Sequence, residues 1–251
     1  MITLLRATER HHDRRREQEV WHTFHRAAET PSRADGFAAL AALDESRLSP
    51  DGDIRRQPHR EVEIVTYVRE GALAQEDSTG RSGVVHAGEF QRRAGGRGAR
   101  GRERNASLTD PAHVFQLCLG RGPSGLEPGH EQKRFSAAQR RGGLCIVASP
   151  DGRSGSLRID QDALMYSALL SPGQHVVHEL SPARSAWLHV VEGEVTFDGL
   201  VLTSGDGAGL TAERAVSLTA REETEILLVD LGGQPPVATG LEVPHEAFPF
   251  E

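Results

Sequence analysis

The sequence predicts an all-β protein made of two tandem copies of one small barrel or jelly-roll unit. Apolar residues at helical spacing are scarce, and short alternating runs are separated by glycine-containing turns. The pattern of the first half also returns in the second. The runs "EIVTYVREGAL" and "AWLHVVEGEVTF" each place an apolar strand before a Gly turn, and "VVHAGEFQ" and "LTSGDGAGL" each continue with a turn and a strand. Two copies of one closed β unit explain this recurrence most simply.

The first unit is expected over residues 1–122. Its clearest strands lie in "EVEIVTYVREGALAQEDSTGRSGVVHAGEFQRRA", with turns at Gly71, Gly80 and Gly88, and in "AHVFQLCLG". Residues 31–49, "PSRADGFAALAALDESRLS", could hold a turn of helix. The basic cluster "RHHDRRREQ" at residues 10–18 is typical of a solvated loop rather than an anion site.

Residues 123–135 are predicted to be a linker, because the stretch "GRGPSGLEPGHEQKRF" at residues 120–135 is rich in Gly and Pro. The second unit then covers residues 136–232. The tail at 233–251 contains Pro and Gly throughout and is expected to wrap over a surface.

Composition indicates a soluble globular protein, with 37% hydrophobic and 26% charged residues in 251. No apolar run approaches the roughly 20 residues of a membrane span, and the N-terminus lacks the charge order of a secretory signal, so we expect a cytoplasmic protein without membrane contact. The net charge of −7 makes nucleic acid a poor partner. The expected partner is a small-molecule substrate or ligand, with the chain a monomer or weak oligomer.

Two segments of the first half gather polar residues that could face a barrel interior. If "QPHREVEIV" is a strand, its alternation puts four polar side chains on one face: Gln57, His59, Glu61 and Glu63. In "ARGRERN", Gly101 and Glu103 share a face, and the arginines at 100, 102 and 104 point the other way. The outward arginines fit an exposed edge strand better than an anion-binding mouth.

The chain resembles the pirin family, and most closely its bacterial two-cupin members associated with quercetin 2,3-dioxygenase activity. The matching motifs run in order along nearly the whole chain: "LLRATER", "WHTF", "PHREVEIVTYVREGAL", "AGEFQR", "EQKRF", "VASPDGRSGSLRIDQDALMYSALL" and "EILLVDL". The resemblance implies two stacked cupin barrels (a bicupin), with one mononuclear metal, usually iron, in the N-terminal barrel. It also implies that His22, inside "WHTF", is a packing residue, and that His175, His178 and His189 belong to a barrel without metal.

The family's metal-ligand pattern is His-Pro-His followed by His-x-Glu. On this chain the four positions are Gln57, His59, Gly101 and Glu103, so the resemblance implies that two of four imidazoles are replaced. Loss of a supporting residue alone costs about 10–100-fold in metal affinity, and loss of two direct ligands should cost more. We therefore expect no cofactor, unless His113 or His25 rebuilds the site for iron or another first-row transition metal.

A metal-free pocket of this kind could still perform acid–base chemistry. His59 and Glu103 are the predicted catalytic residues, since a carboxylate in an apolar barrel tends to have a raised pKa and a histidine beside it can carry a proton. The substrate-binding pocket would be lined by Gln57, Glu61, Glu63, Gly101, His25 and His113. Isomerisation, cyclisation, elimination or hydrolysis of a small aromatic or polyketide-like molecule would suit these groups.

Three interpretations of function remain open from the sequence. The first is the metal-independent enzyme, and the second is a non-catalytic ligand-binding or regulatory protein of the pirin kind. The third is a metal-dependent dioxygenase of the quercetinase kind with a rebuilt site. Fold alone does not choose among them.

Overall fold

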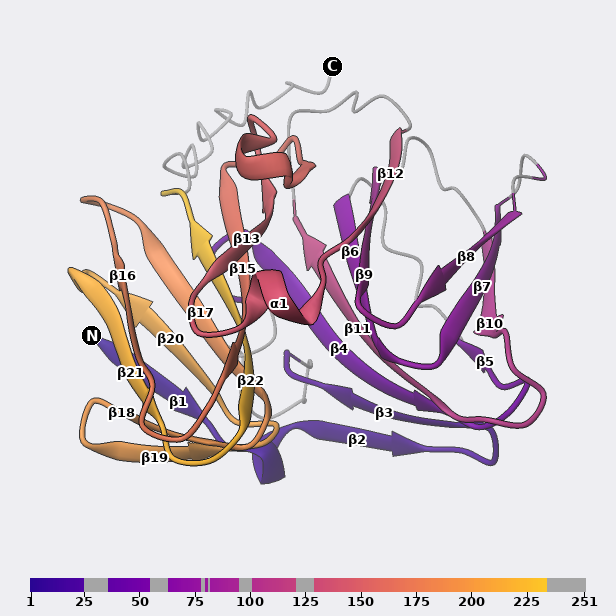
Figure 1. The fold of residues 1–251 in the computed structure, drawn as a ribbon, viewed down its shortest axis with the longest axis horizontal. Coiled ribbons are helices and arrows are strands. Elements are labelled where there is room, and N and C mark those ends of the chain that lie inside the picture. Colours follow the sequence, from indigo (N-terminus) through magenta and orange to yellow (C-terminus); the bar gives the residue numbers. More distant parts are fainter. Residues whose placement is uncertain are drawn as a thin grey trace, which may run out of the picture.

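The computed structural model describes residues 1–24, 36–54, 63–77, 80, 82–94, 101–120 and 129–233, which form two β units side by side (Figure 1). Each unit combines a seven-stranded sheet with a four-stranded sheet. In these ranges the helical elements are short: α1 (Ala137–Arg140) and the 3-10 turns η1 (Ala7–Glu9) and η3 (Arg153–Gly155). The prediction of an all-β chain with two similar units is confirmed.

The first unit holds the candidate site. Its seven-stranded sheet consists of β2 (His11–Arg14), β3 (Gln18–His22), β4 (Leu40–Leu48), β6 (Glu63–Glu70), β9 (Glu89–Ala94), β11 (Ala112–Leu119) and β12 (Gly129–Arg134). Its four-stranded sheet consists of β5 (Asp53–Ile54), β7 (Ala72–Asp77), β8 (Ser82–His86) and β10 (Gly101–Asn105). The spatial orders are β12-β9-β6-β11-β4-β3-β2 and β5-β10-β7-β8. Apolar residues from both sheets pack between them: Leu48, Val68, Leu73, Val85, Ala112 and Val114, with Ile54 against them.

The second unit repeats this design. Its seven-stranded sheet consists of β1 (Ile2–Leu5), β13 (Cys145–Ser149), β14 (Leu157–Arg158), β15 (Ala163–Leu170), β17 (Ser185–Glu192), β20 (Gly207–Thr211) and β22 (Thr224–Leu231). Its four-stranded sheet consists of β16 (His175–Glu179), β18 (Glu194–Phe197), β19 (Leu200–Thr203) and β21 (Ala215–Ala220). The orders are β1-β20-β17-β22-β15-β13-β14 and β16-β21-β18-β19, and an apolar cluster fills the space between the two sheets.

Matching glycine turns account for the similarity of the two halves. Gly71 follows β6 and Gly193 follows β17, with φ of +73° and +89°. A Cβ atom at Gly71 would lie 2.6 Å from the carbonyl oxygen of Pro111, and one at Gly193 would lie 2.5 Å from that of Glu223. Both positions therefore require glycine for the same two reasons, a left-handed backbone and a close neighbouring strand.

The predicted domain boundaries stay a prediction, and strand pairing crosses them at two places. Ile2–Leu5 pairs with β20, so the first residues of the chain complete the sheet of the second unit. Gly129–Arg134, in the segment expected to be a linker, pairs with β9 as an edge strand. Its polar sequence suits an edge, where one side of the strand faces water.

Two further expectations from the sequence are corrected. Leu40–Leu48, where a turn of helix seemed possible, is strand β4 between β3 and β11. Apolar residues occur on both faces of β4 because both faces are packed. The resulting sequence pattern resembles the spacing of apolar residues in a helix. The basic cluster at 10–18 is the β2–β3 hairpin rather than a loop, and Arg10 is buried against Glu45.

The two large sheets pack against each other through their outer faces. Tyr67, Phe90 and Phe115 of the first unit meet Met165, Trp187 and Leu227 of the second in one apolar cluster. Each large sheet is thus covered on both sides, by its own small sheet and by the other unit. Residues on β6, β9 and β11 therefore alternate between a barrel interior and the contact between units.

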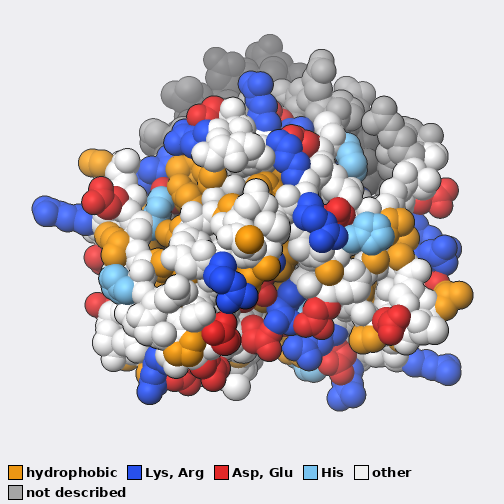
Figure 2. Space-filling view, in the orientation of Figure 1, with side chains coloured by type: hydrophobic (Ala, Val, Ile, Leu, Met, Phe, Trp, Pro, Cys, Tyr) orange, Lys and Arg blue, Asp and Glu red, His pale blue; other side chains and the backbone are white. Residues whose placement is uncertain are grey.

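No helix in the described part of the chain is long and apolar enough to cross a membrane. Basic and acidic side chains are interspersed on the face shown in Figure 2. A cytoplasmic location stays a prediction.

Candidate functional site

Glu103 on β10 is the centre of the polar interior of the first unit. Its side chain is fully buried. One carboxylate oxygen accepts hydrogen bonds from the amide of Gln75 (2.9 Å) and from the guanidinium of Arg93, and the other accepts from the amide of Gln116 (3.0 Å). These partners come from β7, β9 and β11, so both sheets of the unit converge on one carboxylate.

Strand β10 shows the alternation of outward and inward side chains predicted for "ARGRERN". Arg102 and Arg104 point outward and pair with Asp53 and Asp51, while Glu103 points inward. The apolar surroundings expected for Glu103 are not found, since its described partners are two amides and a guanidinium. Sequence reasoning missed Arg93, Gln75 and Gln116, because only strand register brings them to Glu103.

A row of polar side chains crosses the inner face of the seven-stranded sheet. Directly paired residues on neighbouring strands share a face of the sheet. Following the register from β12 to β3 gives Gln132, Gln91, Thr66, Gln116, Asp44 and His22. The amide of Gln116 joins this row to Glu103, and it also lies 3.3 Å from the Thr66 hydroxyl.

His22 and Asp44 form an acid–base pair at the far end of this row. Nδ1 of His22 lies 2.8 Å from Oδ1 of Asp44, and both side chains are about one-fifth exposed. The hydrogen bond to Asp44 raises the pKa of His22, against the opposing effect of burial. The His22 ring also stacks on that of His11 with centroids 5.9 Å apart. His22 was expected to be a packing residue, and the structure instead gives it a carboxylate partner 22 positions away in the sequence.

Two predicted site residues lie on the opposite face of the large sheet. Glu63 accepts hydrogen bonds from the backbone N–H groups of Asp160 and Gln161 and pairs with Arg92, at the contact between the units. Burial raises the pKa of Glu63. It shares its strand face with Val65 and Tyr67, which belong to the apolar cluster between units, so it cannot line the barrel with Glu103.

His113 is the second of these residues. Its Nε2 lies 2.9 Å from Glu45, whose other oxygen accepts from Arg10. Its ring contacts Phe115, which belongs to the cluster between units. His113 is therefore a satisfied histidine at the contact between units and not a residue of the barrel interior. Gln57, His59, Glu61 and His25 lie outside the described residues.

The described half of the expected ligand set does not fit a transition metal. Gly101 supplies no donor atom, and Glu103 already carries a guanidinium and two amide N–H groups on its oxygens. Metal sites require several lone pairs directed at one point, whereas Gln75, Arg93 and Gln116 point N–H bonds at Glu103. No group of three His, Cys, Asp or Glu side chains suited to a metal ion occurs within the described ranges.

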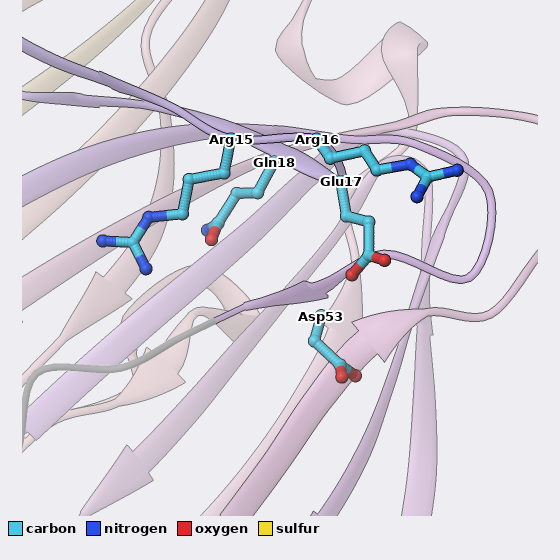
Figure 3. A pocket seen from close by; sticks show the side chains of 5 residues that line it. All are labelled: Arg15, Arg16, Glu17, Gln18 and Asp53. Carbon is cyan, nitrogen blue, oxygen red and sulfur yellow. The ribbon is translucent and has the colours of Figure 1, made fainter.

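A surface hollow lies elsewhere on the first unit, between the β2–β3 turn and β5 (Figure 3). It is lined by Arg15, Arg16, Glu17, Gln18 and Asp53. Asp53 pairs with the outward-facing Arg102, so the hollow is on the outside of the barrel and separate from Glu103. Its mixed charges do not indicate a particular ligand.

Comparison with known proteins identifies relatives of the whole chain. The Pirin family model matches residues 7–119, and the model described as the quercetinase C-terminal cupin domain matches residues 146–231. A quercetin 2,3-dioxygenase of Escherichia coli K12 is 37% identical over 237 residues, which cover 94% of this chain and all of the relative. A pirin-like protein of Caulobacter vibrioides is 31% identical over 195 residues, covering 77% of this chain and 84% of the relative.

Solved structures agree with these matches. The crystal structure of YhhW from Escherichia coli superposes with a TM-score of 0.85 at 37% identity, covering 94% of this chain and 99% of the other. A second structure, of bacterial pirin YhhW in complex with nickel(II), gives 0.84 at 35% identity, covering 93% of this chain and 100% of the other. The two-cupin fold implied by the sequence motifs is confirmed.

Proposed function

Because the chain belongs to the pirin family of two-cupin proteins, we propose that its N-terminal barrel converts a small molecule by acid–base chemistry of side chains, without a resident transition metal. The observation that carries the proposal is the ion pair between Glu103 and Arg93 inside the barrel. At a position where the family supplies a metal-binding carboxylate, this chain neutralises the carboxylate with its own guanidinium. A buried carboxylate needs such a countercharge, and Arg93 provides it.

Two kinds of acid–base group are available in this barrel. Glu103 is the proposed proton acceptor, and its described donors are N–H groups that hold the carboxylate in place and do not pass a proton along a relay. His22, with a raised pKa, suits the role of proton donor, and Asp44 holds its ring by Nδ1. His59 remains the predicted partner of Glu103. A base and an acid in one barrel fit isomerisation, cyclisation or elimination.

A second candidate is metal-dependent dioxygenase chemistry. The names of the Escherichia coli relatives favour it, since one is a quercetin 2,3-dioxygenase and a related structure contains nickel(II). This chemistry would need Glu103 released from Arg93 and further ligands from the segment that contains His59. A non-catalytic ligand-binding protein would have the same metal-free barrel as the proposed enzyme. The two differ only in whether the bound molecule is converted.

Metal analysis separates these candidates. Protein purified without chelator and then dialysed against nickel(II) or iron(II) should retain well below one ion per chain by elemental analysis. The matched control is the triple variant Gln57→His, Gly101→His and Arg93→Met, which restores the family pattern and frees Glu103, and it should gain an ion. One tightly held ion per chain in the unmodified protein would contradict the proposal. With a substrate in hand, loss of turnover in Glu103→Gln would favour the enzyme over the binding protein.

A further inference from the structure

A cluster of titratable side chains lies at one end of the second barrel, far along the chain from Glu103. Tyr166 of β15 and Asp230 of β22 come from the large sheet of this unit, and His178 of β16 comes from its small sheet. Asp230 is the next-to-last residue of β22, so the cluster is at the end toward which the arrow of β22 points in Figure 1.

These three side chains are on the barrel side of their sheets. Asp230 pairs directly with Ala186, which belongs to the apolar cluster inside the barrel. His178 pairs in the same way with Val216 of that cluster, and Tyr166 packs against it. Because directly paired residues share a face, the three polar side chains cover the end of an apolar interior. A ligand would therefore meet them at the end of the barrel and not deep within it.

The carboxylate of Asp230 orients the ring of His178. Its side chain is 3% exposed, its Oδ1 accepts a hydrogen bond from Nε of Arg184, and its Oδ2 lies 2.8 Å from Nε2 of His178. Arg184 also donates to the backbone carbonyl of Asp230 (3.2 Å) and to Asp162 (2.8 Å), which fixes the guanidinium. A carboxylate only accepts hydrogen bonds, so Nε2 of His178 carries the hydrogen atom in this contact.

The opposite ring nitrogen of His178, Nδ1, is therefore the one that holds a lone pair when the ring is neutral. It has no hydrogen-bond partner within the described residues, and it is not a buried atom. The side chain as a whole is 13% exposed. Nδ1 is thus a proton acceptor held in a fixed direction at the end of the barrel.

Tyr166 supplies a donor beside this acceptor. Its ring centroid lies 4.7 Å from that of His178, with an angle of 53° between the ring planes. The side chain is half-buried, and its hydroxyl has no hydrogen-bond partner in the described part of the chain. Burial, and after it the charge of Asp230, raises the pKa of Tyr166, so the hydroxyl keeps its proton and can donate.

The charges around Tyr166 favour a neutral ligand over a permanent anion. Arg153 and Arg184 lie close enough to act on the hydroxyl, since both oppose the rise of its pKa. Each guanidinium is already paired, Arg184 with Asp230 and Arg153 with Asp151. Their positive charge is therefore balanced, and a neutral molecule that can give up a proton suits the site better.

A weakly acidic hydroxyl group matches the two atoms. Its hydrogen would bond to Nδ1 of His178, and its oxygen would accept from the hydroxyl of Tyr166. An enol or a phenol is close enough in acidity to imidazole to transfer its proton, whereas an ordinary alcohol is too weak an acid. On transfer the proton moves from the ligand oxygen to Nδ1, and the imidazolium keeps Nε2–H on Asp230. The resulting oxygen anion still accepts from Tyr166.

We propose that Tyr166, His178 and Asp230 form a second small-molecule site, at the end of the C-terminal barrel, which binds a compound with an enol or phenol hydroxyl and takes up its proton. Tyr166 and His178 touch the ligand, and Asp230 is a positioning residue. The inference concerns the second barrel and does not depend on the function proposed for the first.

The test is the binding of para-nitrophenol to the full chain at neutral pH, measured by ligand-observed NMR and by the absorbance of its phenolate. Bound nitrophenol should contain more phenolate than free nitrophenol does. Para-nitroanisole, which has a methyl group in place of the acidic proton, should bind about tenfold more weakly, the value of one good hydrogen bond.

Two variants locate the binding in the second barrel. His178→Gln keeps a donor for Asp230 and removes the base, so it should abolish the phenolate increase and weaken binding about tenfold. Tyr166→Phe keeps the ring and removes the donor, and it should weaken binding by a similar factor. His175→Gln, at an exposed position on the same strand, is the control and should leave the dissociation constant unchanged.

Unchanged binding in His178→Gln would overturn the inference, and it would place any bound nitrophenol elsewhere, including the N-terminal barrel. Equal binding of nitroanisole, or binding of neither probe, would overturn it as well. NMR of the ring nitrogens tests the role of Asp230 without a ligand. Neutral His178 should be the Nε2–H tautomer, and Asp230→Asn should allow both tautomers. An Nδ1–H tautomer in the unmodified chain would contradict the proposed base.

Discussion

At the scale of single residues, the main feature of the N-terminal barrel is the neutralisation of the buried Glu103 carboxylate by Arg93. A carboxylate that is fully buried is unfavourable without a countercharge, and Glu103 obtains one from Arg93 on a strand of the opposite sheet. The sequence predicts that Glu103 faces inward, because the alternation of β10 is local information. It does not predict Arg93, because that contact depends on how two sheets face each other.

The pair can be tested by removing first the guanidinium and then also the charge of the carboxylate. Arg93→Met should lower the free energy of unfolding by about 3 kcal/mol, because it leaves a buried carboxylate without its countercharge. Glu103→Gln on the Arg93→Met background should recover a large part of that loss, since the amide is neutral. Urea unfolding measures both. A decrease in the free energy of unfolding of less than about 1 kcal/mol in Arg93→Met would contradict this expectation, because only exposed ion pairs contribute so little.

His189 gives a prediction for pH. Both of its ring nitrogens lack hydrogen-bond partners, it is fully buried, and burial lowers its pKa to about 3. The unfolded chain takes up a proton near pH 6.5 and the folded chain does not, so this residue lowers stability as the pH falls from about 6.5 toward 3, by up to about 1.4 kcal/mol per pH unit.

His189→Phe should therefore flatten the pH dependence of the unfolding free energy between pH 6.5 and 5. Glu45 contributes mainly below this window, because His113 and Arg10, against the effect of burial, lower its pKa from 4.5 to about 2. Urea titrations at several pH values measure this. His175→Gln, at an exposed position, is the control and should leave the slope as it is. An unaltered slope in His189→Phe would show that His189 is protonated in the folded protein.

At the scale of secondary-structure elements, sequence patterns located most strands and failed where a strand is packed on both faces or lies at an edge. β4 carries apolar residues on both sides and so lacks simple alternation. β12 is polar and glycine-flanked, so composition alone favoured a linker. Glu63 and His113 were assigned to the barrel because local alternation does not reveal which face of a strand turns to the second unit.

The turn glycines test the repeated design. Gly71→Ala should destabilise the chain by at least about 1 kcal/mol, because it combines a left-handed backbone with a Cβ placed 2.6 Å from the oxygen of Pro111. Gly83→Ala, on β8 in open space, is the matched control and should change stability little. Thermal unfolding of both variants is the measurement. Equal midpoints would mean that the β6–β7 turn adjusts without cost.

At the scale of the whole molecule, a buried polar network joins the two units. Glu225 of the second unit accepts hydrogen bonds from Tyr67 and Arg69 of the first, and from Arg140 of α1. Burial is the largest of the effects that raise the pKa of Tyr67 well above its usual value, so its hydroxyl stays protonated and donates. Together with the apolar cluster, this network makes the outer face of one sheet part of the core of the other unit.

The network predicts coupled unfolding of the two units. Glu225→Ala leaves Arg140 buried without its carboxylate and should cost about 3 kcal/mol, because buried pairs are costly to break on one side. Calorimetry should show one transition in the unmodified chain, and a broader or divided one in Glu225→Ala. Glu222→Ala, at an exposed neighbouring position, is the control. Two separate transitions in the unmodified chain would contradict the coupling.

The central claim is that Arg93, and not a metal ion, neutralises Glu103. The most direct measurement is anomalous diffraction from crystals of the unmodified protein soaked in nickel(II). The account predicts the guanidinium of Arg93 on the carboxylate of Glu103, with no anomalous peak beside it. A nickel peak bound to Glu103, with Arg93 turned away, would contradict it.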